Sequence, residues 1–494
     1  METTLTTNPA FSRFRDGLPV GDVIPFYIDG THHLFILTPP PGTVHFPERL
    51  HTTWRHVVSH DLRTWEELAP AIQPGAKDDV DGGGIWTGSA MIADGVWHIF
   101  YTGHGADQLQ AVCHATSEDG VTWVKDPRNP ISKPDADRFE TKDWRDPFVF
   151  WNDEEQVWWM LVTARSVLTN APSRGVIALA TSQDLETWSE FEVLYDTFLT
   201  HAPECPEIFE LDGRWVLGYS RFTDRRGTVY RVADSPRGPW RTYGAEQPDA
   251  ANWYAAKGLS DSDGRRFAYG WVPDHDESLT YPANPWLWGG DLALPRELRV
   301  SPSGAVTMHL PPEVREGFGE LLPFTARTSD DTWRAAGAGF VADAPGALAV
   351  SVVECQSPRE SYVLRARFDS LDDVHQVGVI VHTSEMIDRG VGVFYYPRIQ
   401  SIRAVDMTAP QGKVSAEYET MFGQYAPVAE HDLATVPAGA VDFTVVVRGD
   451  VVEAFVGEEC CLTYRSKGTA LPFAALVAVD GSATVTELEW RSFE

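Results

Sequence analysis

The sequence is poor in cysteine and in positive charge. Its 494 residues include five cysteines, at positions 113, 205, 355, 460 and 461, and none form a Cys-x-x-Cys pair. An odd and scattered set argues against a disulfide framework or a zinc site and fits a reducing compartment. Lys and Arg number 40 against 71 Asp and Glu, for a formal net charge of −31. Because such a surface repels phosphate backbones, we expect no nucleic-acid partner.

Long apolar runs are missing as well. No segment approaches the roughly 20 apolar residues that a membrane-spanning helix needs, so we expect no membrane partner. The first 17 residues are polar and lack the apolar stretch of a secretory signal. Together with the cysteine usage, this predicts a cytoplasmic protein. Nothing in the sequence indicates an oligomeric state.

The chain is long and rich in aromatic residues. Since a single hydrophobic core stops growing at about 250–300 residues, a chain of this length predicts two domains. Aromatic residues make up 12% of the chain and include 18 Trp. Trp and Tyr present a flat apolar face with a polar edge, which suits stacking on sugar rings as well as packing in cores.

An internal repeat occupies the first 300 residues. Its unit is an apolar strand, a turn and an aromatic-rich strand, and the turns contain the Asp-Gly or Asn-Asp pairs that hairpins favour. Five such units of about four strands predict a five-bladed β-propeller, with a β-sandwich of coincidental hairpins as the alternative. Copies span residues 25–37, 90–103, 148–163, 207–220 and, more weakly, 258–272.

The pattern changes after Pro311-Pro312. Residues 310–322 could form a short helix, and the alternating strands that follow, such as 361–368 and 443–456, are typical of a β-sandwich. The chain is therefore predicted to be all-β, with a propeller followed by a C-terminal β-sandwich. The predicted boundaries are 1–310 for the five-bladed β-propeller, 311–336 for a linker and 337–494 for the sandwich. The neighbouring Cys460 and Cys461 have no assigned role.

Three acids occupy equivalent places in the repeat. Asp22 and Asp146 each lie seven residues before the turn aspartate of their unit, and Glu204 lies eight before its own. This spacing places each acid at the start of the first strand, which in a propeller lines the central axis. Strand alternation puts Glu204 and Glu207 on opposite faces, and we choose Glu204 as the axial residue. The three carboxylates are therefore expected to meet at one mouth of the channel.

Carboxylates that lie close together raise one another's pKa, which costs free energy. Such a cost is expected in a site where the carboxyl groups act as acids and bases. Glycoside hydrolysis needs such a set: a protonated acid for the leaving oxygen and an ionised carboxylate as nucleophile or base. Binding of Ca²⁺ or Mg²⁺ is the competing explanation, but no calcium-loop spacing accompanies the acids, so no metal or cofactor is expected. Arg145 would keep Asp146 ionised and could also hold sugar hydroxyls.

The ordered motifs resemble those of glycoside hydrolase family 32, the invertases and fructan hydrolases. They are RDPFVF (145–150), ECPEIF (204–209), IWTGSA (85–90), TTWRHVVSHDLRTW (52–65), PREL (295–298) and the strand pair 445–465. The resemblance implies a five-bladed propeller with a sandwich and a double-displacement mechanism that retains configuration.

The same resemblance implies the roles of the site residues. Asp22 would be the nucleophile, Glu204 the general acid and base, and Asp146 with Arg145 the pair that holds ring hydroxyls in the transition state. Retention implies carboxyl groups of Asp22 and Glu204 roughly 5–5.5 Å apart. Glu204 must carry a proton in the first step, so we expect its pKa to be raised relative to that of Asp22.

The chain departs from the family around the nucleophile. VGDVIPFY (20–27) replaces an Asn-rich motif, and HLFILTPP (33–40) lacks a Gln that the family carries. The missing amides normally bind the sugar next to the cleaved bond, and an unpaired buried hydroxyl costs about 1–3 kcal/mol. Candidates for substrate binding in their place are Trp54, Trp86, Thr87 and Tyr254. Core packing is the alternative for the two tryptophans.

The leading hypothesis is a retaining glycoside hydrolase that cleaves β-fructofuranosidic linkages in short oligosaccharides. Three alternatives stay open. The first is fructosyl transfer, including formation or hydrolysis of a difructose anhydride. The second is an inverting arabinofuranosidase-type propeller, with the two carboxyl groups roughly 6.5–9.5 Å apart. The third is a sugar-binding propeller without catalysis. The sequence does not fix the furanoside or the linkage.

Overall fold

The computed structural model describes residues 11–44, 47–168, 173–223, 226–249, 252–275, 286–328, 333–336, 339–371, 373–407, 427–432, 439–457, 460–466 and 471–493. The chain divides into two compact units. Unit 1 comprises Met1–Thr242 and Asn252–Arg299, and unit 2 comprises Tyr243–Ala251 and Val300–Glu494. Residues 243–251 thus belong to unit 2, an excursion that the repeat did not indicate.

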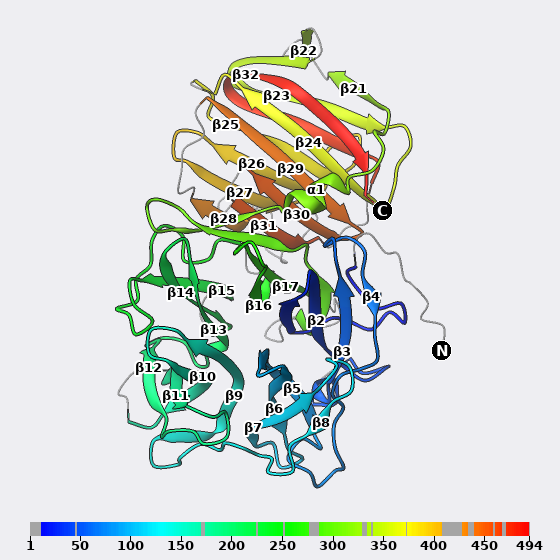
Figure 1. Cartoon of the computed structure of the whole chain (residues 1–494). Helices are drawn as coiled ribbons and strands as arrows, with labels where there is room; N and C mark the ends of the chain where they lie inside the picture. Colours follow the sequence, from blue (N-terminus) through cyan, green and yellow to red (C-terminus); the bar gives the residue numbers. More distant parts are fainter. Residues whose placement is uncertain are drawn as a thin grey trace, which may run out of the picture. The chain divides into compact units, whose positions relative to one another are not determined.

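Unit 1 is a five-bladed β-propeller, as predicted (Figure 1). Most of its blades are antiparallel sheets with their strands in chain order, and a single 3₁₀ turn (Glu48–Leu50) lies in the first. The first blade is β1 (Val23–Ile28), β2 (Thr31–Thr38), β3 (Thr53–Ser59) and β4 (Glu66–Glu67). The second is β5 (Gly84–Ala93), β6 (Val96–His104), β7 (Gln110–Ser117) and β8 (Val124–Lys125). The third is β9 (Phe139–Asn152), β10 (Val157–Ser166), β11 (Gly175–Ser182) and β12 (Glu192–Asp196). The fourth is β13 (Glu204–Leu211), β14 (Arg214–Arg221) and β15 (Gly227–Ala233). The fifth contains β16 (Tyr254–Ser260), β17 (Arg266–His275), β18 (Trp286–Leu292) and β19 (Arg296–Val300).

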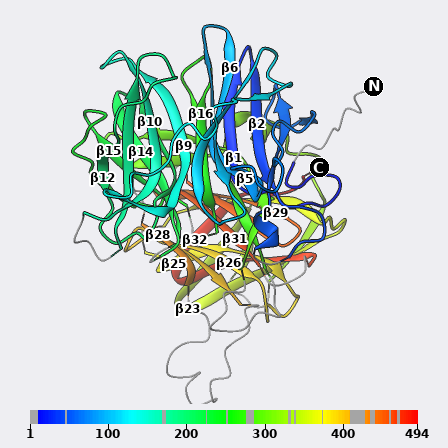
Figure 2. The ribbon, with the colours of Figure 1, turned by 90° about the horizontal axis from the view of Figure 1, so that it is seen from below.

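The first strands of the five blades close a ring. β5 contacts β1 and β9, β13 contacts β9 and β16, and β16 in turn contacts β1. Figure 2 shows β1, β5, β9 and β16 lying side by side. A side chain at the same level of each first strand therefore faces the same axial space, and this is where the candidate acids lie.

Local turn chemistry explains why the hairpins form where the repeat predicts them. The first, second and fourth blades turn on Asp29-Gly30, Asp94-Gly95 and Asp212-Gly213. Both residues of each pair have positive φ, near 50° for Asp and between 72° and 79° for Gly. That combination defines the two-residue hairpin turn whose twist matches the flanking strands, and Asp-Gly is among its favoured sequences.

A second repeated turn follows the third strand of the first three blades. In the first, Oδ1 of Asp61 accepts the backbone N–H groups of Arg63 and Thr64 at 2.9 and 2.7 Å. Asp119 and Asp184 make the equivalent bonds in the next two blades. The carboxylate satisfies amides that the turn would otherwise leave unpaired, which accounts for the Ser-x-Asp segments of the repeat.

Aromatic side chains fill the spaces between neighbouring blades. Trp97 packs in a cluster that joins the first and second blades, Trp144 in one that joins the second and third, and Trp159 in one that joins the third and fourth. Many of the 18 Trp are therefore structural, and those that line the axial space are the exceptions.

Unit 2 is also built of strands, and most of them belong to one hydrogen-bonded sheet. Its elements are β20 (Val306–His309), α1 (Pro312–Glu316), β21 (Phe324–Thr328), β22 (Trp333–Ala336), β23 (Gly339–Cys355), β24 (Ser361–Asp369), β25 (Gln376–Thr383), β26 (Val391–Tyr396), β27 (Ser401–Asp406), β28 (Pro427–Asp432), β29 (Ala440–Arg448), β30 (Val451–Val456), β31 (Cys460–Arg465) and β32 (Phe473–Ser492).

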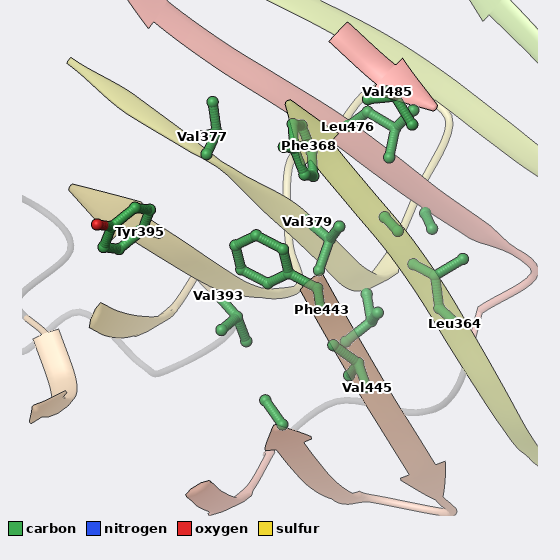
Figure 3. Packing of buried hydrophobic residues seen from close by; sticks show 14 of the residues in the cluster. Leu364, Phe368, Val377, Val379, Val393, Tyr395, Phe443, Val445, Leu476 and Val485 are labelled. Carbon is green, nitrogen blue, oxygen red and sulfur yellow. The ribbon is translucent and has the colours of Figure 1, made fainter. Parts of the chain in front are cut away.

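The long strand β32 lets this sheet fold back on itself like a sandwich. Its first half pairs with β25 and its second half with β24. Between the halves lie Asp480 and Gly481, both with positive φ (51° and 150°). The two layers enclose one apolar core, in which Phe368, Val379 and Phe443 pack together (Figure 3). The predicted all-β chain with a C-terminal sandwich is confirmed in this sandwich-like form.

The stretch expected to be a linker, residues 311–336, carries more structure than that name implies. It begins with the five-residue helix α1, and its second half contains β21 and β22, which pair with β23. In the separate excursion 243–251, Asp249 accepts bonds from the amide and hydroxyl of Thr463 in β31, both at 2.7 Å. In the described part of the chain, no helix is long and apolar enough to cross a membrane.

The core of unit 2 gives a first prediction. Phe443 is 1% exposed in the enclosed core, so Phe443→Ala should lower the free energy of unfolding by about 3–5 kcal/mol. Chemical denaturation followed by circular dichroism measures this change. Leu348→Ala is the matched control, because Leu348 is 55% exposed on β23 and its loss should cost less than about 0.5 kcal/mol. Equal losses for both variants would contradict this description of the core.

Candidate active site

A cavity of about 460 Å³ opens among the first strands of unit 1. Its lining includes all three predicted acids, Asp22, Asp146 and Glu204, with Arg145 beside them. Three of the four residues predicted to bind substrate in place of the missing amides, Trp86, Thr87 and Tyr254, line it as well. The repeat alignment thus located a real meeting point, built from five separate blades.

Each first strand carries an irregularity at the level of this cavity. In the first blade, Leu37 of β2 accepts from Gly21 and donates to Asp22, so two residues face one. In the second blade Thr87 is the extra residue, and the third, fourth and fifth blades shift register beside Asp146, Glu204 and Tyr254. These are β-bulges, which re-aim side chains that a regular strand would send elsewhere.

Asp22 is held by two donors from other blades. The hydroxyl of Thr87 donates to its Oδ2, and the indole N–H of Trp271 donates to its Oδ1 at 2.8 Å. Burial, followed by the charges of Asp146 and Glu204, raises the pKa of Asp22 to about 7 despite these bonds. The group therefore has a fixed orientation and is poised near neutral pH between its two protonation states.

Asp146 is anchored on both sides of its own bulge, where its φ is 58°. Its backbone N–H donates to the hydroxyl of Thr102 at 2.7 Å, and its Oδ2 accepts the N–H of Cys205 at 2.8 Å. The side chain of Arg145 comes within 3.8 Å of the same oxygen. These contacts with a cation and an amide fix the orientation of the carboxylate.

Glu204 is the first residue of β13 and joins two neighbouring blades. Arg145 donates to its Oε1 at 3.1 Å, and the hydroxyl of Tyr254 donates to its Oε2. Burial raises the pKa of Glu204, Arg145 lowers it and Asp146 raises it again. The pKa of Asp22 rises as well, because both groups are buried in the same acidic cavity. The expected order, with the pKa of Glu204 above that of Asp22, stays a prediction.

Three expectations need correction. Trp54 does not line the cavity: it is 0% exposed in the core between the first two blades, and its indole donates to the carbonyl of Trp86. Asp146 lies inside β9, not at its start. Glu204 and Glu207 do not face opposite sides, because the bulge between them pairs them with Ser220 and Gly218, which lie two residues apart on β14.

The bulge sends Glu207 to a different environment from Glu204, even though they share a face. Glu207 is fully buried, and its Oε2 accepts from Arg266 at 2.7 Å and from the N–H of Gly258 at 2.8 Å. It lies between the fourth and fifth blades and does not line the cavity. The choice of Glu204 as the axial acid therefore agrees with the structure, although the counting that led to it was wrong.

Sequence reasoning missed several cavity residues. They are Trp271 and Trp288 from the fifth blade, Arg226 and Phe222 from the fourth, and Gln110 and Asp143. The side chain of Arg226 lies 5.0 Å from the ring centre of Tyr254 and 5.9 Å from that of Trp271. One sequence feature pointed to some of these residues: the Trp-rich segment WLWGGD at 286–291. It lies after the weakest repeat unit, 258–272, where the repeat is hard to recognise.

A second cavity, of about 730 Å³, adjoins the first. The two share Leu50, Trp86, Gln110 and Asp143 in their linings. At the junction, the indole of Trp86 donates to the carbonyl of Leu50 at 2.9 Å and stacks on His104 with ring centres 4.2 Å apart. Trp86 is therefore fixed as a flat platform that faces both spaces.

Among the described residues, no group of three or more His, Cys, Asp or Glu side chains is placed to hold a metal ion.

Fold and site together define a class of proteins: five-bladed propellers that gather carboxylates from separate blades in an axial cavity. The family model "Glycosyl hydrolases family 32 N-terminal domain" matches residues 24–311, and the model "Glycosyl hydrolases family 32 C terminal" matches residues 342–491. This chain belongs to glycosyl hydrolases family 32.

Similar proteins agree with this assignment. Beta-fructofuranosidase, insoluble isoenzyme 1, of Oryza sativa subsp. indica is 30% identical over 325 residues, covering 59% of this chain and 53% of the rice protein. Levanase of Bacillus subtilis (strain 168) is 29% identical over 310 residues, covering 56% and 42%. The matches thus span about half the length of these relatives. The crystal structure of fructan 1-exohydrolase IIa from Cichorium intybus shares the fold, with a TM-score of 0.74 at 18% identity and coverage of 99% and 98%.

The hydrogen bond from Thr87 gives a prediction that needs no substrate. Thr87→Val removes a donor to the ionised form of Asp22, so the pKa of Asp22 should rise above about 7, by roughly one unit. Carboxyl ¹³C NMR of labelled protein measures the titration, with Asp22→Asn assigning the resonance. Thr116→Val, in β7 outside the cavity, should leave it unchanged; an unchanged titration in Thr87→Val as well would show that this bond does not hold Asp22.

Proposed function

We propose that this protein hydrolyses β-fructofuranosidic linkages in short oligosaccharides and retains the anomeric configuration. The observation that carries the proposal is the convergence of Asp22, Asp146 and Glu204, each with its own donors, in one cavity. The family and the names of the similar proteins, a beta-fructofuranosidase and a levanase, support the fructosyl substrate.

In the first step, Oδ of ionised Asp22 attacks the anomeric carbon and forms a glycosyl ester. The bond from that carbon to the leaving oxygen breaks, and protonated Glu204 gives its proton to this oxygen. The raised pKa of Glu204 supports its role as the acid. The Trp271 and Thr87 donors fix the carboxylate of Asp22 for the attack, which limits the orientation that has to be found in each turnover.

In the second step, Glu204 takes a proton from water, and the resulting oxygen attacks the same carbon. The ester bond to Asp22 breaks, and Asp22 leaves as the carboxylate. Two displacements at one carbon restore the starting configuration. Asp146 and Arg145 hold hydroxyls of the ring, and the negative charge of Asp146 favours the positive charge that the ring carbon gains in the transition state.

The fructosyl ring would meet an unusual set of partners. Leu37 stands where the family carries its strand Gln, and it lines the cavity next to Asp22. Polar recognition there falls to Arg226 and Tyr254, while Trp271 and Trp288 offer apolar faces. Aromatic and guanidinium groups would thus replace the amides that this chain lacks.

The second cavity supports oligosaccharides over simple disaccharides. It begins at Trp86, beyond the three acids, and its lining adds polar side chains, among them His51, Gln108 and Lys142. A chain of sugars that leaves its terminal ring beside Asp22 would continue across the face of Trp86 into this space. Stacking on an indole and hydrogen bonds to a polar rim are the usual means of holding a sugar.

Product analysis tests the activity. The protein is incubated with sucrose, short inulin and levan oligosaccharides, difructose anhydrides and arabinofuranosides, and products are followed by NMR. Release of β-fructofuranose first is expected. The α anomer would contradict retention, an anhydride product would indicate transfer, cleavage of arabinofuranosides alone would overturn the substrate, and no turnover would indicate a sugar-binding protein.

Glu204→Gln should lower turnover by about 10²–10⁴-fold, because the amide cannot donate a proton to the leaving group or take one from water. Its matched control is Glu210→Gln, an exposed glutamate on the same strand β13, which should turn over like the parent protein. The rates of both variants are measured on the substrate that the product analysis identifies. Similar rates for the two would show that Glu204 does not act as the acid and base.

His51 tests the second cavity. His51→Ala should lower kcat/KM for tri- and tetrasaccharides about three- to tenfold more than for a disaccharide, as expected for the loss of one hydrogen bond to a remote ring. His60→Ala is the control, because His60 is exposed at the turn after β3 and lines neither cavity. An equal loss on all chain lengths would argue against oligosaccharide binding in this space.

A further inference from the structure

Lys257 is a buried lysine just behind the acids. It lies in β16, next to the bulge at Ala255 and Ala256, and is 1% exposed. Lysine is almost never fully buried unless something compensates its charge, since an isolated ammonium in a protein interior is strongly destabilising. The mechanism above assigns it no role.

The ammonium reaches from the fifth blade across to two others. Its Nζ is 3.4 Å from the carbonyl oxygen of Pro206 in β13 and 4.9 Å from the ring centre of Phe148 in β9. Pro206 directly follows Cys205, whose N–H bonds Asp146 and whose Sγ lies 3.6 Å from Oδ2 of Asp22. Lys257 therefore lies against the chain segment that connects the two acids.

Two buried arginines at this level have carboxylate partners of their own. Arg145 bonds Glu204 at 3.1 Å, and Arg266 bonds Glu207 at 2.7 Å. Among the described residues, no carboxylate lies within ion-pair distance of Lys257. Its charge is compensated by the carbonyl of Pro206 and, at longer range, by the acids around it, and a nearby aromatic face adds a weaker attraction.

The titratable groups that face Lys257 come from three strands or their ends. They are Cys205 and Glu207 from β13, Asp146 from β9 and Asp22 just before β1. Burial lowers the pKa of Lys257, and these four groups raise it. Because an interaction between two charges acts equally on both, the ammonium must favour the ionised form of Asp22 in return.

We propose that Lys257 is a positioning residue whose buried ammonium keeps Asp22 ionised while Glu204 holds its proton. Without the ammonium behind it, Asp22 would compete with Glu204 for that proton. Lys257 acts through the Cys205–Pro206 segment and through its charge, without touching the substrate. The inference rests on the function proposed above.

Charge-changing variants test the proposal. Lys257→Met and Lys257→Gln remove the charge with side chains of similar length, and Lys257→Arg keeps it. The acidic limb of the kcat/KM profile reports ionisation of the nucleophile. Losing the cation raises the pKa of Asp22, so this limb should move to higher pH by roughly one unit in both neutral variants and stay in place in Lys257→Arg.

Carboxyl ¹³C NMR separates this test from the activity itself. The Asp22 resonance should titrate at higher pH in the neutral variants whether or not a substrate has been found. If the parent protein cleaves no fructoside but this shift is present, the proposed function fails and the electrostatic role stands in modified form. An unshifted Asp22 titration in a folded neutral variant overturns the role of Lys257 even if kcat falls.

Two controls distinguish a charge effect from a packing defect. Lys125→Met removes a lysine that pairs with Asp81 at 2.6 Å in the second blade, outside the cavity, and should leave the Asp22 titration unchanged. Thermal unfolding shows whether each variant is folded. If both neutral variants fail to fold while Lys257→Arg folds, the lysine serves folding and the proposal is overturned.

Discussion

The site depends on one constraint: like charges that repel one another have to be buried together. Asp22, Asp146 and Glu204 share one cavity, and burial with mutual repulsion raises the pKa of Asp22 and of Glu204. Such an arrangement persists only when fixed donors and cations surround it. Thr87, Trp271, Arg145 and Tyr254 provide these contacts, and they come from three different blades. The closed ring of blades is what brings them within reach.

The parts of the fold that the sequence predicted are those with local causes. Asp-Gly pairs force a particular hairpin turn, and Ser-x-Asp segments cap the next one, so both repeat visibly along the chain. The three acids were found by their distance from these turns. That inference needed no long-range contact, because a repeat places equivalent residues at equivalent heights in a propeller.

The rest depended on features that strand counting cannot detect. Alternation assumes a regular period of two, and the bulges at the cavity break that period, which is why the faces of Glu204 and Glu207 were misjudged. Trp54 and Trp86 look alike in sequence, but β3 places the first in a core while β5 places the second on the cavity. Trp271 and Trp288 reach the site through the pairing of β17 with β18 in the least regular repeat. Lys257 gave no signal, because a lysine in a strand is usually exposed.

The bulges also have a consequence for how such proteins diverge. A bulged residue has no partner opposite it on the next strand, so exchanging its side chain disturbs little of the sheet's hydrogen bonding. In this chain each of the five blades carries such an irregularity at or beside its cavity residue. During evolution, the side chains that line the cavity can therefore change in one blade at a time while the hydrogen-bonded sheets stay the same. This chain and fructan 1-exohydrolase IIa from Cichorium intybus share the fold at 18% identity, which is consistent with such independent exchange of side chains.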